Sequence, residues 1–265
     1  MSDQHYYQYA FARPGCSVQA IGPGVDPRFE VEVVCDGPIA AVASRVGLDR
    51  FDVKKLQGET AEDIGWLNQV AIRHHEIVRQ AAESSAVLPL RLGTVFRSRA
   101  SLLAAAARCR KTVADFLHTL GDRQEWTVKL YLEKQSAEET TGHGSSPPLD
   151  HAPRADTGAE YMKRKKAQLQ WRRELRAGLQ EEIQVMEHQL KTGTDGCCRV
   201  RLLPASLTGR PEKMVFNAAF LIPPSRVKTW LATVGRVRES VRRRGLLLEV
   251  TGPSPPYHFC PTPEL

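Results

Sequence analysis

Residues 214–222 read Met-Val-Phe-Asn-Ala-Ala-Phe-Leu-Ile, an uncharged run that predicts a buried strand. A Pro-Pro-Ser sequence at 223–225 follows directly and favours the start of a helix, because proline is tolerated in the first helical turn. Apolar residues then recur at helical spacing until Gly245, and residues 246–250 predict one more strand. This part of the chain is therefore expected to form a strand, a helix and a strand.

The residues before this stretch predict a second unit of the same kind. An alternating strand is expected at 126–132, a long charged helix with one apolar stripe at about 159–191, and a strand at 198–203. The order β-α-β-β-α-β is that of a ferredoxin-like domain, in which two helices pack on one face of an antiparallel sheet. We assign this domain to residues 123–250. Residues at about 135–158 contain almost no large apolar side chain, which predicts a mobile insertion there.

The first half, residues 1–122, is predicted to be a separate domain of mixed α and β structure. A hairpin is expected around the Asp-Gly-Pro at 36–38, because Asp-Gly between two β-type runs is a strong turn signal. Helices are predicted at 60–83, behind a capping-box sequence, and at 98–121. Between them, residues 87–96 predict a strand that is interrupted by a proline and a glycine, and hence an edge or bulged strand. The predicted fold class of the whole chain is α+β in two domains.

Residues 251–265 form a proline-rich tail. The prolines lack a backbone N–H, so this segment is not expected to be helical or to pair continuously as a strand. We predict that the tail packs between the two domains, with Pro256, Tyr257 and Phe259 as its anchors.

The net charge of +7 is carried entirely by the second half of the chain. Residues 1–122 contain 14 basic and 14 acidic residues, whereas residues 123–265 contain 23 and 16. This asymmetry suggests two domains with different partners. Much of the excess forms a predicted basic surface on two helical stretches, made of Lys163, Arg164, Lys165, Lys166, Arg172, Arg173, Arg242, Arg243 and Arg244. Such runs are typical of a solvated helix face, and the alternative is a site for an acidic partner.

Motifs for catalysis, nucleotide binding and metal binding are missing from the sequence. It contains no GxGxxG, no GxxxxGK[ST] and no CxxC pair among six cysteines, which are expected to be reduced thiols. The His-His-Glu at 74–76 does not match the HExxH of metalloproteases, because Arg79 stands where the second histidine is required. We therefore predict no catalytic, cofactor-binding or metal-ligating residue, a protein that is not an enzyme, and structural roles for both histidines.

Membrane insertion and secretion are also without support in the sequence. The best uncharged run is shorter than the roughly 20 apolar residues of a membrane-spanning helix. The N-terminus has neither the basic nor the apolar region of a signal peptide. We expect a cytoplasmic protein without a membrane partner.

A basic ferredoxin-like domain also invites comparison with RNA-binding modules, in which aromatic residues of the third strand stack on bases. Phe216 and Phe220 lie on one face of the predicted third strand, but the run around them is apolar enough to be core. We interpret both as buried sheet residues. A basic nucleic-acid-binding protein stays the alternative function.

Three segments together resemble the gas vesicle protein F/L family. They are Val-Leu-Pro-Leu-Arg-Leu-Gly-Thr-Val-Phe at 87–96, Met-Val-Phe-Asn-Ala-Ala-Phe-Leu at 214–221 and Thr-Gly-Pro-Ser-Pro-Pro-Tyr-His-Phe at 251–259, in the order that the family has. The chain departs from the family pattern at Ser254, where tryptophan is usual, and at Leu92 and Phe216, where phenylalanine and leucine are commoner.

This resemblance implies a non-enzymatic accessory or minor structural protein that needs no cofactor and is associated with gas vesicles. It also implies that the main partner is the small hydrophobic shell protein, with other accessory proteins as further partners. A shell subunit must expose apolar surface before it assembles, and an accessory protein could hold that surface. The candidate contact residues on the interrupted strand are Leu90, Arg91, Leu92 and Phe96. The other interpretation of this strand is a bulged part of the core.

Overall fold

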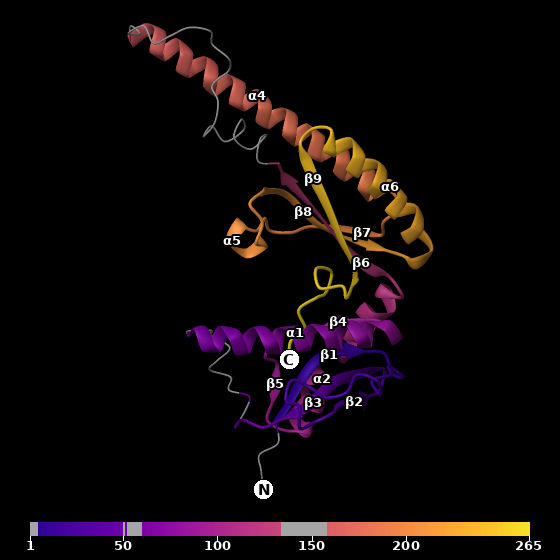
Figure 1. Cartoon of the computed structure of the whole chain (residues 1–265). Helices are drawn as coiled ribbons and strands as arrows, with labels where there is room; N and C mark the ends of the chain where they lie inside the picture. The colour runs from indigo at the N-terminus through magenta and orange to yellow at the C-terminus, as the bar shows by residue number, and fades with distance from the viewer. Residues whose placement is uncertain (1–4, 50, 52–59, 134–157) are drawn as a thin grey trace. The chain divides into compact units, whose positions relative to one another are not determined.

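The computed structural model describes residues 5–49, 51, 60–133 and 158–265 (Figure 1). The chain divides into two compact units. Unit 1 consists of Met1–Glu125 together with Pro253–Leu265, and unit 2 consists of Trp126–Gly252. The predicted mobile insertion lies outside the described residues, except for its last position.

Unit 1 is built on a five-stranded sheet. Its strands are β1 (His5–Ala12), β2 (Val31–Asp36), β3 (Ile39–Val46), β4 (Val87–Pro89) and β5 (Val95–Phe96). They are arranged in the order β2-β3-β1-β4, and β5 also pairs with β1. Strand β1 pairs antiparallel with β3, β4 and β5, and β2 pairs antiparallel with β3. The predicted hairpin joins β2 to β3, where Asp36 pairs with Ile39 and Gly37 takes the positive φ of +62° that glycine tolerates.

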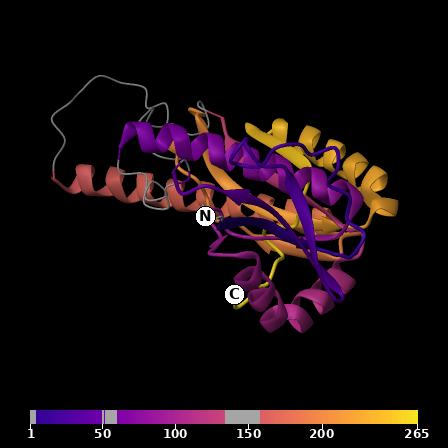
Figure 2. The same cartoon turned by 90° about the horizontal axis from the view of Figure 1, so that it is seen from below.

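Two helices cover the opposite faces of this sheet (Figure 2). Helix α1 (Ala61–Ser84) begins at the predicted capping box of Thr60 and Asp63, and helix α2 (Arg99–Leu120) begins behind Ser98. The side of the sheet that faces α1 includes Tyr7 and Tyr9, and the side that faces α2 includes Phe11.

Strand β1 can serve both faces because its register with β3 shifts between Gln8 and Ala10. A bulge adds one residue and thereby reverses the side to which the following side chains point. This shift places Tyr7 and Phe11, which are four positions apart, on opposite faces.

The strand predicted at 87–96 is divided into the two short strands β4 and β5. Pro89 ends β4, and Gly93, with φ of +83°, lies in the turn before β5. Both strands pair with β1 on the side away from β3, so they form one edge of the sheet, as predicted.

Unit 2 contains a four-stranded sheet. Its strands β6 (Gln124–Leu132), β7 (Gly196–Arg199), β8 (Lys213–Ile222) and β9 (Leu246–Ser254) are ordered β7-β8-β6-β9. Helix α4 (Gly158–Lys191) follows β6, the short helix α5 (Ala205–Thr208) lies between β7 and β8, and helix α6 (Pro224–Arg242) precedes β9. Helix α5 was not predicted, because its four residues are too few to show a helical period.

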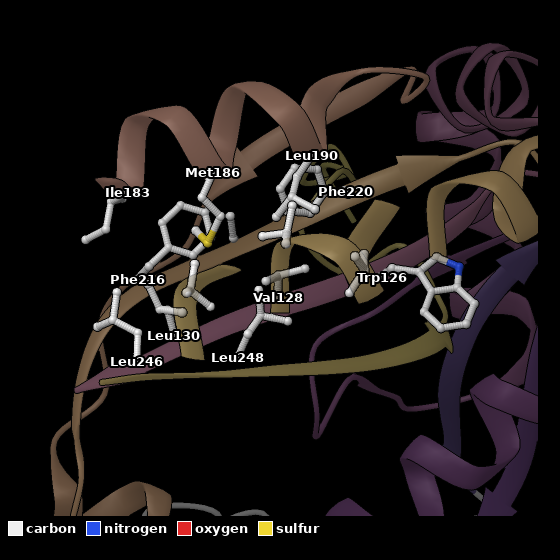
Figure 3. Packing of buried hydrophobic residues seen from close by; sticks show 14 of the residues in the cluster. Trp126, Val128, Leu130, Ile183, Met186, Leu190, Phe216, Phe220, Leu246 and Leu248 are labelled. Atoms are coloured by element: carbon white, nitrogen blue, oxygen red, sulfur yellow. The ribbon is translucent and has the colours of Figure 1, made fainter. Parts of the chain in front are cut away.

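The core of unit 2 lies between the sheet and helices α4 and α6. Figure 3 shows Ile183, Met186 and Leu190 of α4 facing side chains of the sheet such as Phe216 and Phe220. Trp230 of α6 completes this core, and its Nε1 donates a hydrogen bond of 2.8 Å to the carbonyl of Leu190. Both units are thus mixed α and β structures with antiparallel sheets, which confirms the predicted α+β class.

One prediction for the C-terminal residues is wrong. Strand β9 continues through Gly252 and Pro253 to Ser254, although we expected no continuous pairing beyond residue 250. The strand order places β9 at the end of its sheet. A proline is compatible with an edge strand, because only one side of such a strand needs N–H groups for its neighbour.

Candidate functional site

Unit 1 contains an open hollow of about 640 Å³. Three segments that are far apart in the sequence line it: helix α1, the turn between β4 and β5, and the C-terminal tail. The lining residues include His74, His75, Pro89, Leu90, Arg91, Leu92, Thr94, Tyr257, Cys260, Pro261 and Leu265. Three of the four predicted contact residues and one predicted tail anchor therefore meet at one place.

The turn between β4 and β5 forms a fixed wall of the hollow. The Leu90 N–H donates to the carbonyl of Tyr9 over 2.9 Å, and the Gly93 N–H donates to the hydroxyl of Tyr7 over 3.1 Å. The Thr94 N–H and hydroxyl both donate to the carbonyl of Arg91. These bonds hold the turn against β1, so its side chains have defined positions.

The predicted contact residues differ in how accessible they are. Leu90 is only 6% exposed and packs in the core beneath α2, whereas Arg91 is exposed. Leu92 and Phe96 are half-buried, on the α1 and α2 sides respectively. For Leu90 the structure supports the alternative interpretation, a core residue, and any partner would meet Arg91 and Leu92 first.

His74 at the base of the hollow is held neutral by its surroundings. The hydroxyl of Tyr7 accepts the Gly93 N–H and shares a hydrogen bond of 2.9 Å with Nδ1 of His74. Burial, and to a lesser degree the charge of neighbouring His75, lowers the pKa of His74 to about 4. Burial also raises the pKa of Tyr7 far above its usual value, so this phenol keeps its proton. The structural role predicted for His74 fits this arrangement.

We expect His74 to make unit 1 less stable in acid. Above pH 6.5 the imidazole is neutral in both the folded and the unfolded chain. Between pH 6.5 and about pH 4 the imidazole is protonated in the unfolded chain but stays neutral in the folded chain, so the free energy of unfolding falls with the pH. The predicted loss of unfolding free energy between these values is about 3 kcal/mol. Urea unfolding at half-unit pH steps measures it, and His74→Gln, which does not titrate here, should flatten the dependence. If the free energy of unfolding fell equally with pH in the unchanged chain and in His74→Gln, His74 would not be the group responsible.

The tail lies against α1 through Tyr257. Its hydroxyl is 3.0 Å from Nδ1 of His75, and the two rings are stacked with centroids 5.7 Å apart. Burial raises the pKa of Tyr257 well above its usual value and that of the Cys260 thiol to about 12. Of the predicted anchors, Pro256 is buried, Phe259 is half-buried and Tyr257 is 37% exposed. These contacts are all within unit 1, and the proposed place of the tail between two domains stays a prediction.

A second attachment of the tail was missed by sequence reasoning. Glu125 is 1% exposed and accepts two hydrogen bonds from His258, from its backbone N–H at 2.9 Å and its Nδ1 at 2.7 Å. The hydrogen bond to Glu125 raises the pKa of His258. Its stabilisation is therefore fully present below pH 6.5 and is lost as the pH rises through the folded pKa. The partners are 133 positions apart, and no local pattern connects them.

The predicted basic surface is distributed over α4 and the end of α6. Lys165, Lys166 and Arg173 on α4 are exposed, as are Arg242 and Arg243 at the end of α6. Arg244 is exposed but forms an ion pair with Glu182. The side chains of Lys163, Arg164 and Arg172 lie outside the described residues.

The aromatic residues weighed for base stacking are not accessible. Phe216 and Phe220 are 0% exposed in the core of unit 2, as the interpretation as buried sheet residues predicts. Within the ranges that the structure describes, no group of three or more His, Cys, Asp or Glu residues is placed to hold a metal ion. No described helix is long and apolar enough to span a membrane.

Comparison with known proteins gives matches over nearly the whole chain. The family model described as gas vesicle synthesis protein GvpL/GvpF matches residues 5–261. Gas vesicle protein L of Streptomyces sp. (strain CB03234) is 29% identical over 267 residues, which cover 98% of this chain and 94% of that protein. Gas vesicle protein F of the same strain is 24% identical over 267 residues, with 96% and 98% covered.

Two solved structures have a similar fold. The gas vesicle protein GvpF from Anabaena sp. PCC7120 has a TM-score of 0.69 at 19% identity, with 97% of this chain and 96% of that chain covered. GvpF from Microcystis aeruginosa has a TM-score of 0.66 at 16% identity, with 96% and 98% covered.

Proposed function

This chain belongs to the gas vesicle synthesis protein GvpL/GvpF family, and from that premise we propose that it is a non-enzymatic accessory or minor structural protein that binds the small hydrophobic shell protein of gas vesicles. The observation that carries the proposal is the extent of the family match, which includes both units and the tail. Other gas vesicle accessory proteins are further proposed partners, and association with gas vesicles in the cytoplasm is the proposed location.

The hollow of unit 1 is the proposed contact site for the shell protein. Its wall combines the half-buried Leu92 with the ring of Tyr257, and the exposed Arg91 stands at its rim. Apolar side chains in a concave surface can cover an apolar segment of an unassembled subunit. The neighbouring strands β4 and β5 lie at a sheet edge, which supports pairing with an extended segment.

We also propose that unit 2 is a ferredoxin-like domain. Two features support it: the element order β6-α4-β7-β8-α6-β9, apart from short α5, and the strand order β7-β8-β6-β9.

A pull-down of the tagged protein co-expressed with the shell protein, with nuclease present, tests the proposed function. We expect the shell protein to be retained at both low and high salt, because an apolar contact is not weakened by salt as phosphate binding is. Leu92→Asp, in the wall, should reduce retention at least tenfold. Arg91→Asp is a second variant at an exposed position, where the fold is not at risk, and a smaller loss is expected.

Ile72→Asp is the matched control, because Ile72 lies on α1, is 61% exposed and does not line the hollow. It should retain the shell protein as the unchanged chain does. Equal losses in Leu92→Asp and Ile72→Asp would reject the hollow as the contact site. Failure to retain the shell protein, with nucleic acid recovered at low salt once nuclease is omitted, would reject the proposed function itself.

A further inference from the structure

Unit 2 has a second hollow, of about 350 Å³, that runs along strand β9. Five consecutive residues of β9, Leu246 to Val250, line it together with three arginines, Arg210, Arg238 and Arg242. Five residues of a strand extend over roughly 16 Å. The hollow therefore follows a strand rather than a single side chain.

Strand β9 is open on one side. In the part of the sheet that the structure describes, its neighbour is β6, and β9 ends the order β7-β8-β6-β9 (Figure 1). An edge strand presents a row of backbone N–H and C=O groups to which another strand can pair. Leu246 and Leu248 point into the core, so the alternate residues are left for the outer face.

Arginines flank this edge from both sides of the sheet. Arg238 and Arg242 are exposed, one turn apart on α6, the helix that packs on the core face. Arg210 comes from the other side, where its guanidinium lies 4.7 Å from the ring centroid of Tyr131 and donates to Glu249 over 2.8 Å. Three arginines and one glutamate leave the lining with a charge of +2.

Two arginines of α6, Arg238 and Arg242, are not neutralised by the part of the protein that the structure describes, whereas Arg226 of the same helix pairs with Asp195. Neither Arg238 nor Arg242 has an ion pair with another described residue, whereas Arg244 pairs with Glu182. Two like charges at i and i+4 on a helix repel each other. The carboxylate of Glu249, in contrast, already faces Arg210 and, at 3.9 Å, Lys129. An anionic partner would neutralise Arg238 and Arg242.

We propose that this groove, made of β9 and Arg210, Arg238 and Arg242, binds an acidic segment of a second protein in extended conformation, as an added strand beside β9. Backbone pairing would supply the attachment, and the arginines would select carboxylate side chains. A nucleic acid fits less well, because none of the described lining residues is aromatic and so none offers a face for base stacking. This site is separate from the hollow of unit 1 and does not depend on the proposed shell contact.

Fluorescence anisotropy of labelled eight-residue peptides with the full chain tests the proposal. A peptide of alternating valine and glutamate should bind at least tenfold more tightly than one of alternating valine and lysine. N-methylation of the backbone amides of the acidic peptide should also lower its affinity at least tenfold, because the methylated peptide keeps its charge but cannot donate hydrogen bonds to β9. Equal binding of the methylated peptide would overturn strand addition.

Two charge-reversed variants locate the site. Arg238→Glu with Arg242→Glu should abolish binding of the acidic peptide. Arg236→Glu with Arg243→Glu changes the net charge equally at exposed positions of α6 and of the residue that follows it, outside the lining, and should bind within twofold of the unchanged chain. Equal loss in both variants would overturn the site in favour of general charge attraction. Tighter binding of a labelled ten-nucleotide single strand than of the acidic peptide, lost in the first variant alone, would overturn the acidic segment in favour of a phosphate ligand.

Discussion

Trp230→Ala is expected to lower the free energy of unfolding of unit 2 by about 4 kcal/mol. The indole is 2% exposed where α4, α6 and the sheet meet, with Phe220 and Trp126 at ring-centroid distances of 5.7 and 6.1 Å. The change leaves a large cavity and deprives the buried carbonyl of Leu190 of its donor. Urea unfolding followed by far-ultraviolet circular dichroism measures the loss.

Two further variants separate the causes of this effect. Trp230→Phe keeps most of the apolar volume but not the N–H, so a loss of about 1–2 kcal/mol is expected. Lys228→Ala changes an exposed position of the same helix and should stay within about 0.5 kcal/mol of the unchanged chain. A loss below about 1.5 kcal/mol for Trp230→Ala would show that this ring is not a centre of the core.

Removal of residues 255–265 is expected to destabilise unit 1 by about 3 kcal/mol. The truncation leaves β9 intact but takes away the buried Pro255 and Pro256 and both donors of His258 to Glu125. The side chain of Glu125, which is 1% exposed, then loses both hydrogen bonds that it accepts from His258, and such a loss is costly for a buried polar group. Hydrogen–deuterium exchange of α1 should become faster by about two orders of magnitude.

A shorter truncation provides the control for the tail. Deleting residues 263–265 leaves Tyr257, His258 and Cys260 in place, so exchange in α1 should change by less than threefold. His258→Gln keeps a side-chain donor for Glu125 and should recover part of the loss that His258→Ala produces. Exchange that is unaffected by the longer truncation would show that unit 1 does not depend on the tail.

The features that were predictable from the sequence are those set by neighbouring residues. The capping box of Thr60 and Asp63 fixes the start of α1 within four positions, and Gly37 fixes the hairpin. Pro89 and Gly93 likewise show where the edge strand is divided. In each case a side chain or a φ value acts on backbone at most a few residues away.

The features that were not predictable depend on residues far apart in the chain. Glu125 and His258 meet only because the tail returns to unit 1. The periodicity of apolar residues in the sequence does not indicate that the tail packs there. For Leu90 a signal was available: consecutive apolar residues at 87–90 are typical of a strand covered on both faces. The strand is indeed covered by α1 and α2, and so its edge position does not make Leu90 a surface residue.

The division of the chain has a consequence for its synthesis. Unit 1 takes its last residues from Pro253–Leu265, so all of Trp126–Gly252 must leave the ribosome before unit 1 is whole. Domains commonly fold in the order in which they are translated. In this chain the order is reversed. All residues of the middle unit have been synthesised before those of the N-terminal unit, because unit 1 still lacks Tyr257 and His258. A chain that ends at residue 252 would thus contain all of unit 2 but only part of unit 1.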